Sequence, residues 1–115
     1  MKLEIRPDDG AAPPGQELTG HVHVHEGGSS RTLVLTLRFW ERSASFSSTP
    51  FASGGVIHEG DLATGQAVDF RCPIPAWATP GVKGKHAELF WELEAVSDSP
   101  GLNARATTVV EIRAR

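Results

Sequence analysis

The apolar residues of this sequence recur at every second position, in short runs separated by turns rich in glycine and proline. Residues 32–42 and 66–74 show the pattern most clearly. Their alternating apolar residues are Leu33, Leu35, Leu37, Phe39, Val68, Phe70, Cys72 and Ile74. This spacing is typical of a β-strand with one buried face, whereas a helix needs apolar residues three or four positions apart. The sequence therefore predicts an all-β protein.

Seven such segments occur along the 115 residues, a length typical of one domain. The predicted strands span residues 2–6, 17–25, 32–42, 54–63, 66–74, 85–97 and 104–113. Several short strands joined by turns are typical of two packed sheets. We therefore expect one all-β domain over residues 1–115, a seven-stranded immunoglobulin-like sandwich. In the immunoglobulin order, 32–42 lies beside 85–97, and 17–25 lies beside 66–74.

The outward-facing residues of strands 32–42 and 85–97 carry opposite charges. Arg38 and Arg42 belong to the first strand, and Glu88, Glu92 and Glu94 belong to the second. Opposite charges on neighbouring strands stabilise a sheet by roughly 0.2–1 kcal/mol per pair. This predicts a solvated, charge-paired sheet face. The alternative interpretation is an active site that uses two of the carboxylates.

Charge and cysteine content exclude several classes of protein. The net charge is −3, and Lys83 and Lys85 are the nearest approach to a basic cluster, so we expect neither nucleic acid nor an anionic membrane as partner. Cys72 is the only cysteine, which rules out an internal disulfide. The first ten residues are charged at positions 2, 4, 6, 8 and 9, and no apolar run reaches ~18 residues. These features favour a cytoplasmic protein.

Four short motifs are more specific than alternation alone. They are Pro14-Gly15-Gln16-Glu17, Gly20-His21-Val22-His23-Val24, Phe70-Arg71-Cys72-Pro73 and the late aromatic strand Ala87–Ala95. Together they resemble one domain of the arrestin-like group, which includes the bacterial sporulation-control proteins of Spo0M type. The resemblance implies an adaptor or scaffold rather than an enzyme. It also implies two tandem sandwiches, so a single one suggests self-association or a partner that supplies the second half.

Histidine occupies every second position of the segment His21-Val22-His23-Val24-His25. On a strand these three imidazoles line one face, and Asp69 would share that face if 17–25 lies beside 66–74. Imidazole suits zinc and copper, so the stripe is a candidate metal site. The alternative interpretations are an ordinary polar face or a pH-sensitive surface, and we assign no metal ligand and no cofactor.

The segment from Ser43 to Ser53 is predicted to be a long polar loop that carries Phe46 and Phe51. Loops on a rigid sandwich often carry binding, and exposed aromatic side chains are favoured anchors. Phe46 and Phe51 are therefore the candidate partner-binding residues. The alternative is that they plug the end of the sandwich or that Phe51 begins an edge strand. An open sheet edge that accepts a partner's strand is a further candidate surface.

No enzyme motif is found, because the G-x-G-x-x-G, phosphate-loop and G-x-S-x-G patterns are all absent. Cys72 alternates with Val68 and Phe70, which predicts a buried apolar residue rather than a nucleophile. The sequence thus favours a non-enzymatic adaptor with a protein partner, and a homo-oligomer is possible. A metal-binding β-domain and a carbohydrate-binding or adhesion module stay open as alternatives, although Trp40, Trp77 and Trp91 are dispersed along the chain.

Overall fold

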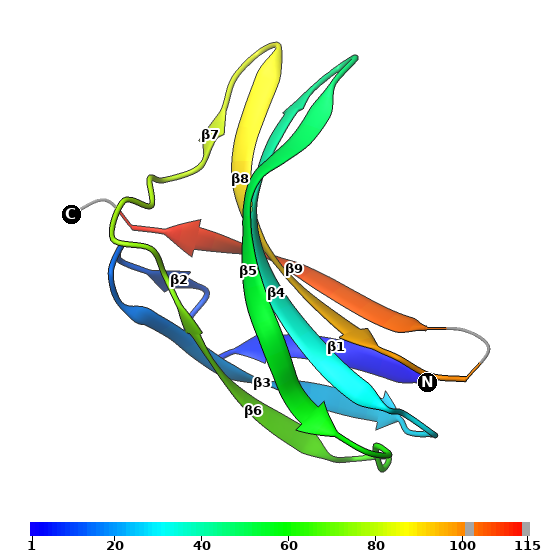
Figure 1. Ribbon diagram of the computed structural model, residues 1–115. Helices are drawn as coiled ribbons and strands as arrows, with labels where there is room; N and C mark the ends of the chain where they lie inside the picture. The colour runs from blue at the N-terminus through cyan, green and yellow to red at the C-terminus, as the bar shows by residue number, and fades with distance from the viewer. Residues whose placement is uncertain (101–102, 114–115) are drawn as a thin grey trace.

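The computed structural model describes residues 1–100 and 103–113, so the expected domain range of 1–115 includes four residues outside the described part. The described residues form nine strands and no helix (Figure 1). No helix that could cross a membrane is found among them. The strands are β1 Lys2–Pro7, β2 Ala11–Ala12, β3 Glu17–Glu26, β4 Thr32–Ser43, β5 Ser47–Glu59, β6 Ala67–Pro73, β7 Val82–Lys83, β8 Ala87–Ser97 and β9 Ala104–Ile112.

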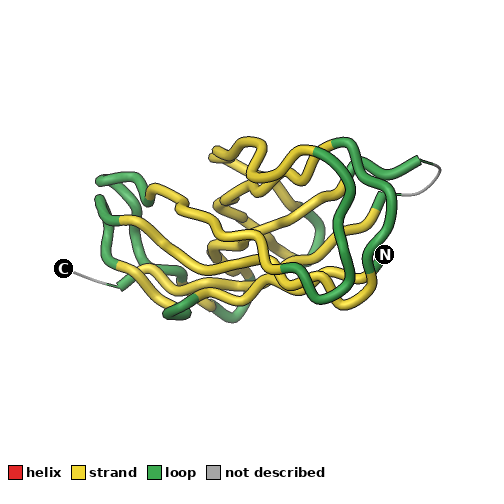
Figure 2. Tube along the Cα trace, turned by 90° about the horizontal axis from the view of Figure 1, so that it is seen from below, coloured by secondary structure: helices red, strands yellow, loops and turns green. Residues whose placement is uncertain are grey.

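The strands are divided between two sheets. One sheet has three strands in the order β1-β3-β6, and the other has six in the order β2-β9-β8-β4-β5, with β7 beside β8. Only the β2–β9 pair is parallel, and the other pairs of named strands are antiparallel. The expected neighbours are confirmed, because β4 pairs with β8 and β3 pairs with β6. The turns lie mainly at the two ends of the molecule (Figure 2).

The two sheets differ from the predicted seven strands in two respects. The structure adds two short strands, β2 and β7, which are too short to show alternation in sequence. It also places β5 at Ser47–Glu59 instead of residues 54–63, so the predicted loop of residues 43–53 and the predicted end of the strand are both wrong. Residues 47–53 continue an antiparallel hairpin with β4, since Phe51 pairs with Phe39 and Ser47 pairs with Arg42.

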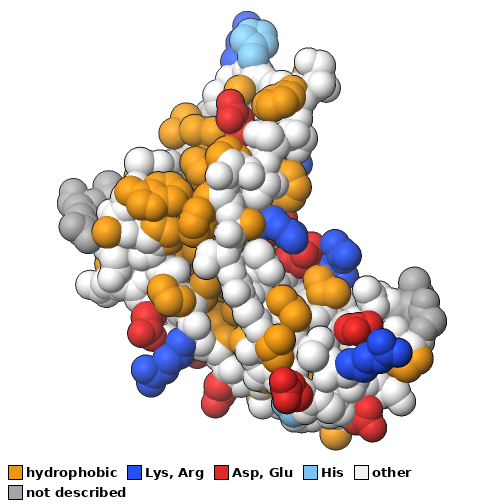
Figure 3. Space-filling model, in the orientation of Figure 1, with side chains coloured by type: hydrophobic (Ala, Val, Ile, Leu, Met, Phe, Trp, Pro, Cys, Tyr) orange, Lys and Arg blue, Asp and Glu red, His pale blue; other side chains and the backbone are white. Residues whose placement is uncertain are grey.

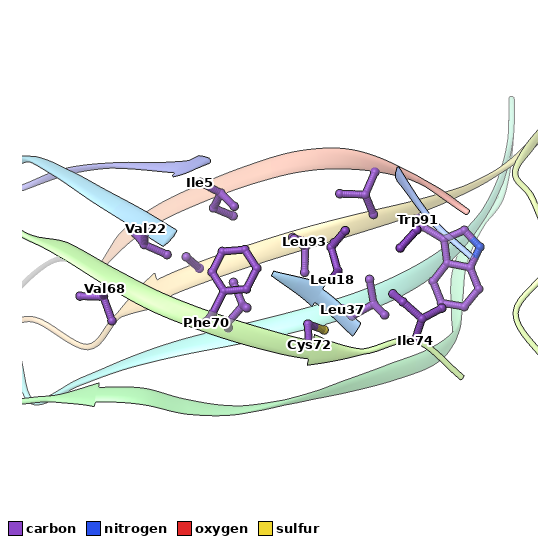
Figure 4. Packing of buried hydrophobic residues seen from close by; sticks show 14 of the residues in the cluster. Ile5, Leu18, Val22, Leu37, Val68, Phe70, Cys72, Ile74, Trp91 and Leu93 are labelled. Atoms are coloured by element: carbon purple, nitrogen blue, oxygen red, sulfur yellow. The ribbon is translucent and has the colours of Figure 1, made fainter. Parts of the chain in front are cut away.

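The core lies between the two sheets and is built from the alternating apolar residues (Figure 4). β6 shows the principle, because Val68, Phe70 and Cys72 are buried while the residues between them are exposed. Trp91 on β8 is the largest fully buried side chain, at 1% exposure, and its indole Nε1 donates a hydrogen bond to the Thr79 carbonyl at 2.8 Å. Burial also raises the pKa of the Cys72 thiol to about 11, which keeps it protonated and unreactive.

At two positions of the sequence motifs, the backbone conformation or the packing explains why the residue is glycine. Gly15 adopts a positive φ of 81° in the turn before β3, a conformation that favours glycine. Gly20 on β3 lies so close to β1 that an added Cβ would stand 2.5 Å from the carbonyl oxygen of Arg6. Gly20 is thus a position of close backbone approach inside a strand, where a side chain has no room.

Strands β4, β5 and β8 are longer than the three-stranded sheet that they face. Their ends project beyond the sandwich as a curved arm, which consists of residues 39–51 and 82–90 and forms the upper part of Figure 1. The turn between β4 and β5 and the turn between β7 and β8 meet at its tip, where Ser43 pairs with Ala87. The arm leaves strand surface uncovered by the other sheet, and the candidate site lies at its base.

Candidate functional site

Four aromatic side chains are in contact where the arm joins the sandwich. Phe39 stacks on the buried Trp91, with ring centroids 4.6 Å apart. Phe51 on β5 contacts Trp91 at 6.0 Å, and Trp77 packs edge-to-face on Phe51 at 5.1 Å. Trp77 also lies 5.9 Å from Trp91. We call these four residues the aromatic cluster.

The aromatic cluster is buried on one side and open on the other. Trp91 is 1% exposed, while Trp77 is 56% exposed. Trp77 follows β6 in the loop before β7, and the hydrogen bond from Ala78 N to Pro75 O closes the turn that holds it. Hydrophobic side chains gather on the visible face where the arm meets the sandwich (Figure 3). The result is a rigid aromatic surface presented to solvent.

The two predicted partner-binding residues lie at different ends of the arm. Phe46 is 56% exposed in the turn between β4 and β5, which the hydrogen bond from Ser43 N to Phe46 O closes at 2.7 Å. Phe51 lies at the base of the arm, half-buried and packed against the core. The alternative that Phe51 begins an edge strand is right about the edge and wrong about the start. Within the described residues β5 pairs with β4 alone, but it begins at Ser47, four residues before Phe51.

The tip of the arm is basic, although the whole chain has a net charge of −3. The turn after β4 and the turn between β7 and β8 together line a shallow hollow that includes Arg42, Lys83, Lys85 and His86. Figure 3 shows cationic and histidine side chains at the top of the arm. Arg42 is engaged by Glu88 and lies over the Phe90 ring, 4.9 Å from its centroid. The fold therefore brings Arg42 to the same end of the molecule as Lys83, Lys85 and His86, which lie about forty positions later in the sequence.

The charged outer face of the six-stranded sheet is paired as the sequence predicts. Glu94, with its side chain 8% exposed, lies 2.6 Å from Arg38 and 3.0 Å from Arg105. Glu88 pairs with Arg42, and Glu92 accepts a hydrogen bond from the Trp40 indole at 3.1 Å. Each carboxylate thus has a structural partner of its own.

The histidine stripe lines one face of β3, as the alternation predicts. His21 lies opposite Asp69 in the β3–β6 register, and the rings of His23 and His25 are 4.5 Å apart. His25 Nε2 lies 2.6 Å from a carboxylate oxygen of Glu4 on β1. Within residues 1–100 and 103–113, no group of three His, Cys, Asp or Glu side chains has the arrangement of a metal site.

The stripe predicts a loss of stability in mild acid. Desolvation, together with the nearby Arg6 and His25, lowers the pKa of His23 below its usual 6.5. A histidine with a depressed folded-state pKa stabilises the fold above pH 6.5, and this contribution is lost as the pH falls through the folded pKa. Glu4 keeps its charge through this pH range, because hydrogen bonds from Arg6 and His25 hold its pKa below the usual 4.5.

We therefore expect the melting temperature to fall between pH 7.5 and pH 5.5, and His23→Gln to show a smaller fall. Thermal melts followed by circular dichroism at the two pH values test this. His86→Gln is the matched control, because His86 lies at the tip of the arm, away from the stripe. An equal fall in wild type and His23→Gln would contradict the role assigned to His23.

Trp77 is the site residue that sequence reasoning missed. The three tryptophans are dispersed along the chain, yet the fold brings Trp77 and Trp91 together across fourteen positions of sequence. The only local signal is a large aromatic residue between prolines 75 and 80, in a loop where turn residues are expected. That signal indicates an ordered loop but does not say what the indole contacts.

Comparison with solved structures finds the same fold in the crystal structure of Spo0M, the sporulation control protein of Bacillus subtilis. The match covers 99% of this chain and 49% of the Spo0M chain, with a TM-score of 0.74 and 18% sequence identity. The chain thus spans about half the length of Spo0M, and the arrestin-like fold of Spo0M type is confirmed. No protein-family model and no curated protein matches the sequence.

Proposed function

We propose that this chain is a non-enzymatic protein-binding module of the arrestin-like type, which acts as an adaptor or scaffold. The observation that carries the proposal is the Trp77 side chain, which is 56% exposed and held in place by Phe51 and Trp91. Exposed tryptophans on a rigid support are typical binding anchors, because they bury a large area and lose little conformational entropy.

The remaining chemistry of the surface also supports a binding module. The carboxylates of the outer face are engaged by arginines or an indole, and the Cys72 thiol is buried with a raised pKa. Neither arrangement offers a free nucleophile or general base. Spo0M is a sporulation control protein, so a regulatory role for the similar fold is in keeping with this proposal.

The proposal predicts that Trp77→Ser weakens partner capture without unfolding the domain. A hot-spot tryptophan contributes about 2 kcal/mol or more to binding, so we expect the affinity to fall roughly thirtyfold or more. The test is a pull-down from native cell extract, with the purified domain as bait and quantitative mass spectrometry of the captured proteins. Phe51→Ser is unsuitable for this purpose, because Phe51 packs against the core.

Val109→Ser is the matched control, since Val109 is an exposed apolar residue, at 64%, on β9 and outside the loop that carries Trp77. Circular dichroism confirms that each variant is folded. Phe46→Ser shows in the same experiment whether the tip of the arm contributes. Equal capture by wild type and Trp77→Ser would refute the aromatic surface as the binding site, and binding to a glycan array alone would favour a carbohydrate module.

A further inference from the structure

On one side of the sandwich, β5 and β6 approach each other without pairing among the described residues. Each of these strands pairs with one neighbour only, β5 with β4 and β6 with β3, within the part of the chain that the structure describes. At the opposite side of the sandwich, β1 packs beside β9 and closes the two sheets. The β5–β6 side therefore presents two free strand edges with a seam between them.

The middle of β5 has the features of an accepting edge. Residues 51–56 pair with β4 in unbroken register, between two irregularities at Leu33/Val34 and Phe39/Glu41. No Lys, Arg, Asp or Glu occurs between residues 47 and 57. Soluble proteins usually protect a free edge with charges, prolines or bulges. Here Pro50 and the bulges protect the ends of the strand and leave its middle open.

Small residues on β5 leave a groove in the seam between β5 and β6. Ser53 and Gly55 lie opposite Leu37 and Leu35 on β4, so they occupy core-facing positions. Both are exposed, while Leu35 and Leu37 are buried. Small residues at these positions leave a groove of about 220 Å³ between β5 and β6. Its lining includes the core residues Leu35 and Cys72.

The dimensions and charges of the groove indicate its occupant. A cavity of roughly 150 Å³ holds a benzene ring, so the groove has room for one large apolar side chain. Arg71 of β6 also lines the groove, with its side chain 81% exposed. The guanidinium lies 3.8 Å from Glu17, which is too far for a hydrogen bond and leaves it able to bind another carboxylate.

We propose that the β5 edge binds an extended peptide segment of a partner protein, which adds a strand beside residues 51–56. One large apolar side chain of that segment fills the groove over Leu35 and Cys72, and a neighbouring acidic side chain pairs with Arg71. The proposal rests on the protein-binding function above and names the chemistry of the partner. Phe51 belongs to both surfaces, so the added strand would run toward the aromatic cluster.

The test is selection of a phage-displayed library of random ten-residue peptides on the wild-type domain, followed by fluorescence anisotropy of the enriched peptides. We expect enrichment of peptides with a large apolar residue near Asp or Glu. Gly55→Leu should weaken their binding at least tenfold, because the new side chain fills the groove. A Cβ at Gly55 meets no atom within 4 Å, so this variant keeps the fold. Arg71→Gln should weaken binding severalfold.

Two controls separate strand addition from other modes of binding. A peptide N-methylated at alternate positions keeps its side chains but loses backbone donors, so its binding should fall at least tenfold. Trp77→Ser reports on the aromatic surface, because Trp77 is not among the residues that line the groove. If Trp77→Ser weakens capture from extract while no peptide is enriched, strand addition is wrong and the protein-binding function stands.

Equal peptide affinity for wild type and Gly55→Leu would overturn the proposal, as would equal affinity of the N-methylated peptide. Light scattering at several protein concentrations tests whether a second copy of this chain occupies the β5 edge. A wild-type dimer that Gly55→Leu converts to a monomer would mean that a second copy of this chain, rather than a partner's peptide, occupies the edge.

Discussion

Trp91→Ala is expected to lower the free energy of unfolding by about 4 kcal/mol, because truncation of a buried tryptophan leaves a large cavity. The side chain is 1% exposed, stacks on Phe39 at 4.6 Å and donates a hydrogen bond to Thr79. The substitution removes the buried ring together with its stacking contact and its hydrogen bond, and leaves the Thr79 carbonyl without its donor. Domains of this size are stable by only about 5–15 kcal/mol, so the variant should be close to unfolding.

Urea unfolding followed by circular dichroism measures this loss, and the melting temperature should fall by roughly 15 °C. Trp77→Ala is the matched control, because it removes the same side chain from a position that is 56% exposed. We expect the control to cost less than about 1 kcal/mol. Similar losses in the two variants would mean that Trp91 is not the structural support of the aromatic cluster.

Gly20→Val is expected to destabilise the fold by about 3 kcal/mol through overpacking. A Cβ at this position would stand 2.5 Å from the Arg6 carbonyl oxygen, 2.7 Å from Pro7 Cα and 2.9 Å from Phe70 Cζ. Two of these contacts are with backbone, so β1 must move away from β3. Intrinsic propensity acts in the opposite direction, since valine favours strands and glycine does not.

The control for Gly20→Val is Gly10→Ala, because an added Cβ at Gly10 meets no atom within 4 Å. Chemical denaturation should show the control within about 0.5 kcal/mol of wild type. A Gly20→Val variant as stable as wild type would contradict the close approach of β1 and β3. A stable variant would also remove the physical reason for glycine in the Gly20-His21-Val22 motif.

The alternation of apolar residues was sufficient to predict most of the fold. β3, β4, β6 and β8 begin and end within two residues of their predicted positions, because each buries one face and leaves the other in solvent. The pairing of β4 with β8 was expected from the immunoglobulin strand order, and the opposite charges of Arg42 and Glu88 on the outer faces agreed with it. An alternating apolar pattern arises where a strand buries one face, and these strands bury one face along most of their length.

The first half of β5 could not be predicted by the same means. Residues 47–51 lie on an arm that the other sheet does not cover, so most of their side chains are exposed and no alternation arises. The strand is held by backbone pairing with β4. Ser47, Ser48 and Thr49 therefore resemble loop residues in sequence, although they form a hairpin in the structure.

The candidate site was predictable only in part. Phe46 and Phe51 were identified as aromatic residues in a polar segment, and one of them belongs to the aromatic cluster. Trp77 was missed because its contacts with Phe51 and Trp91 join segments far apart in the chain. The groove was missed because small residues at core-facing positions become visible only when the register of β4 and β5 is known.

Photo-crosslinking at position 77 shows directly whether a partner protein contacts the aromatic surface. The photoreactive residue benzoylphenylalanine replaces Trp77 in one variant and Val109 in another, and both are irradiated in native cell extract. If the aromatic surface binds the partner, we expect protein adducts at position 77 and none above background at position 109. Adducts of equal yield at both positions, or at position 109 alone, would contradict the claim that the aromatic surface of the arm is where this module binds its partner.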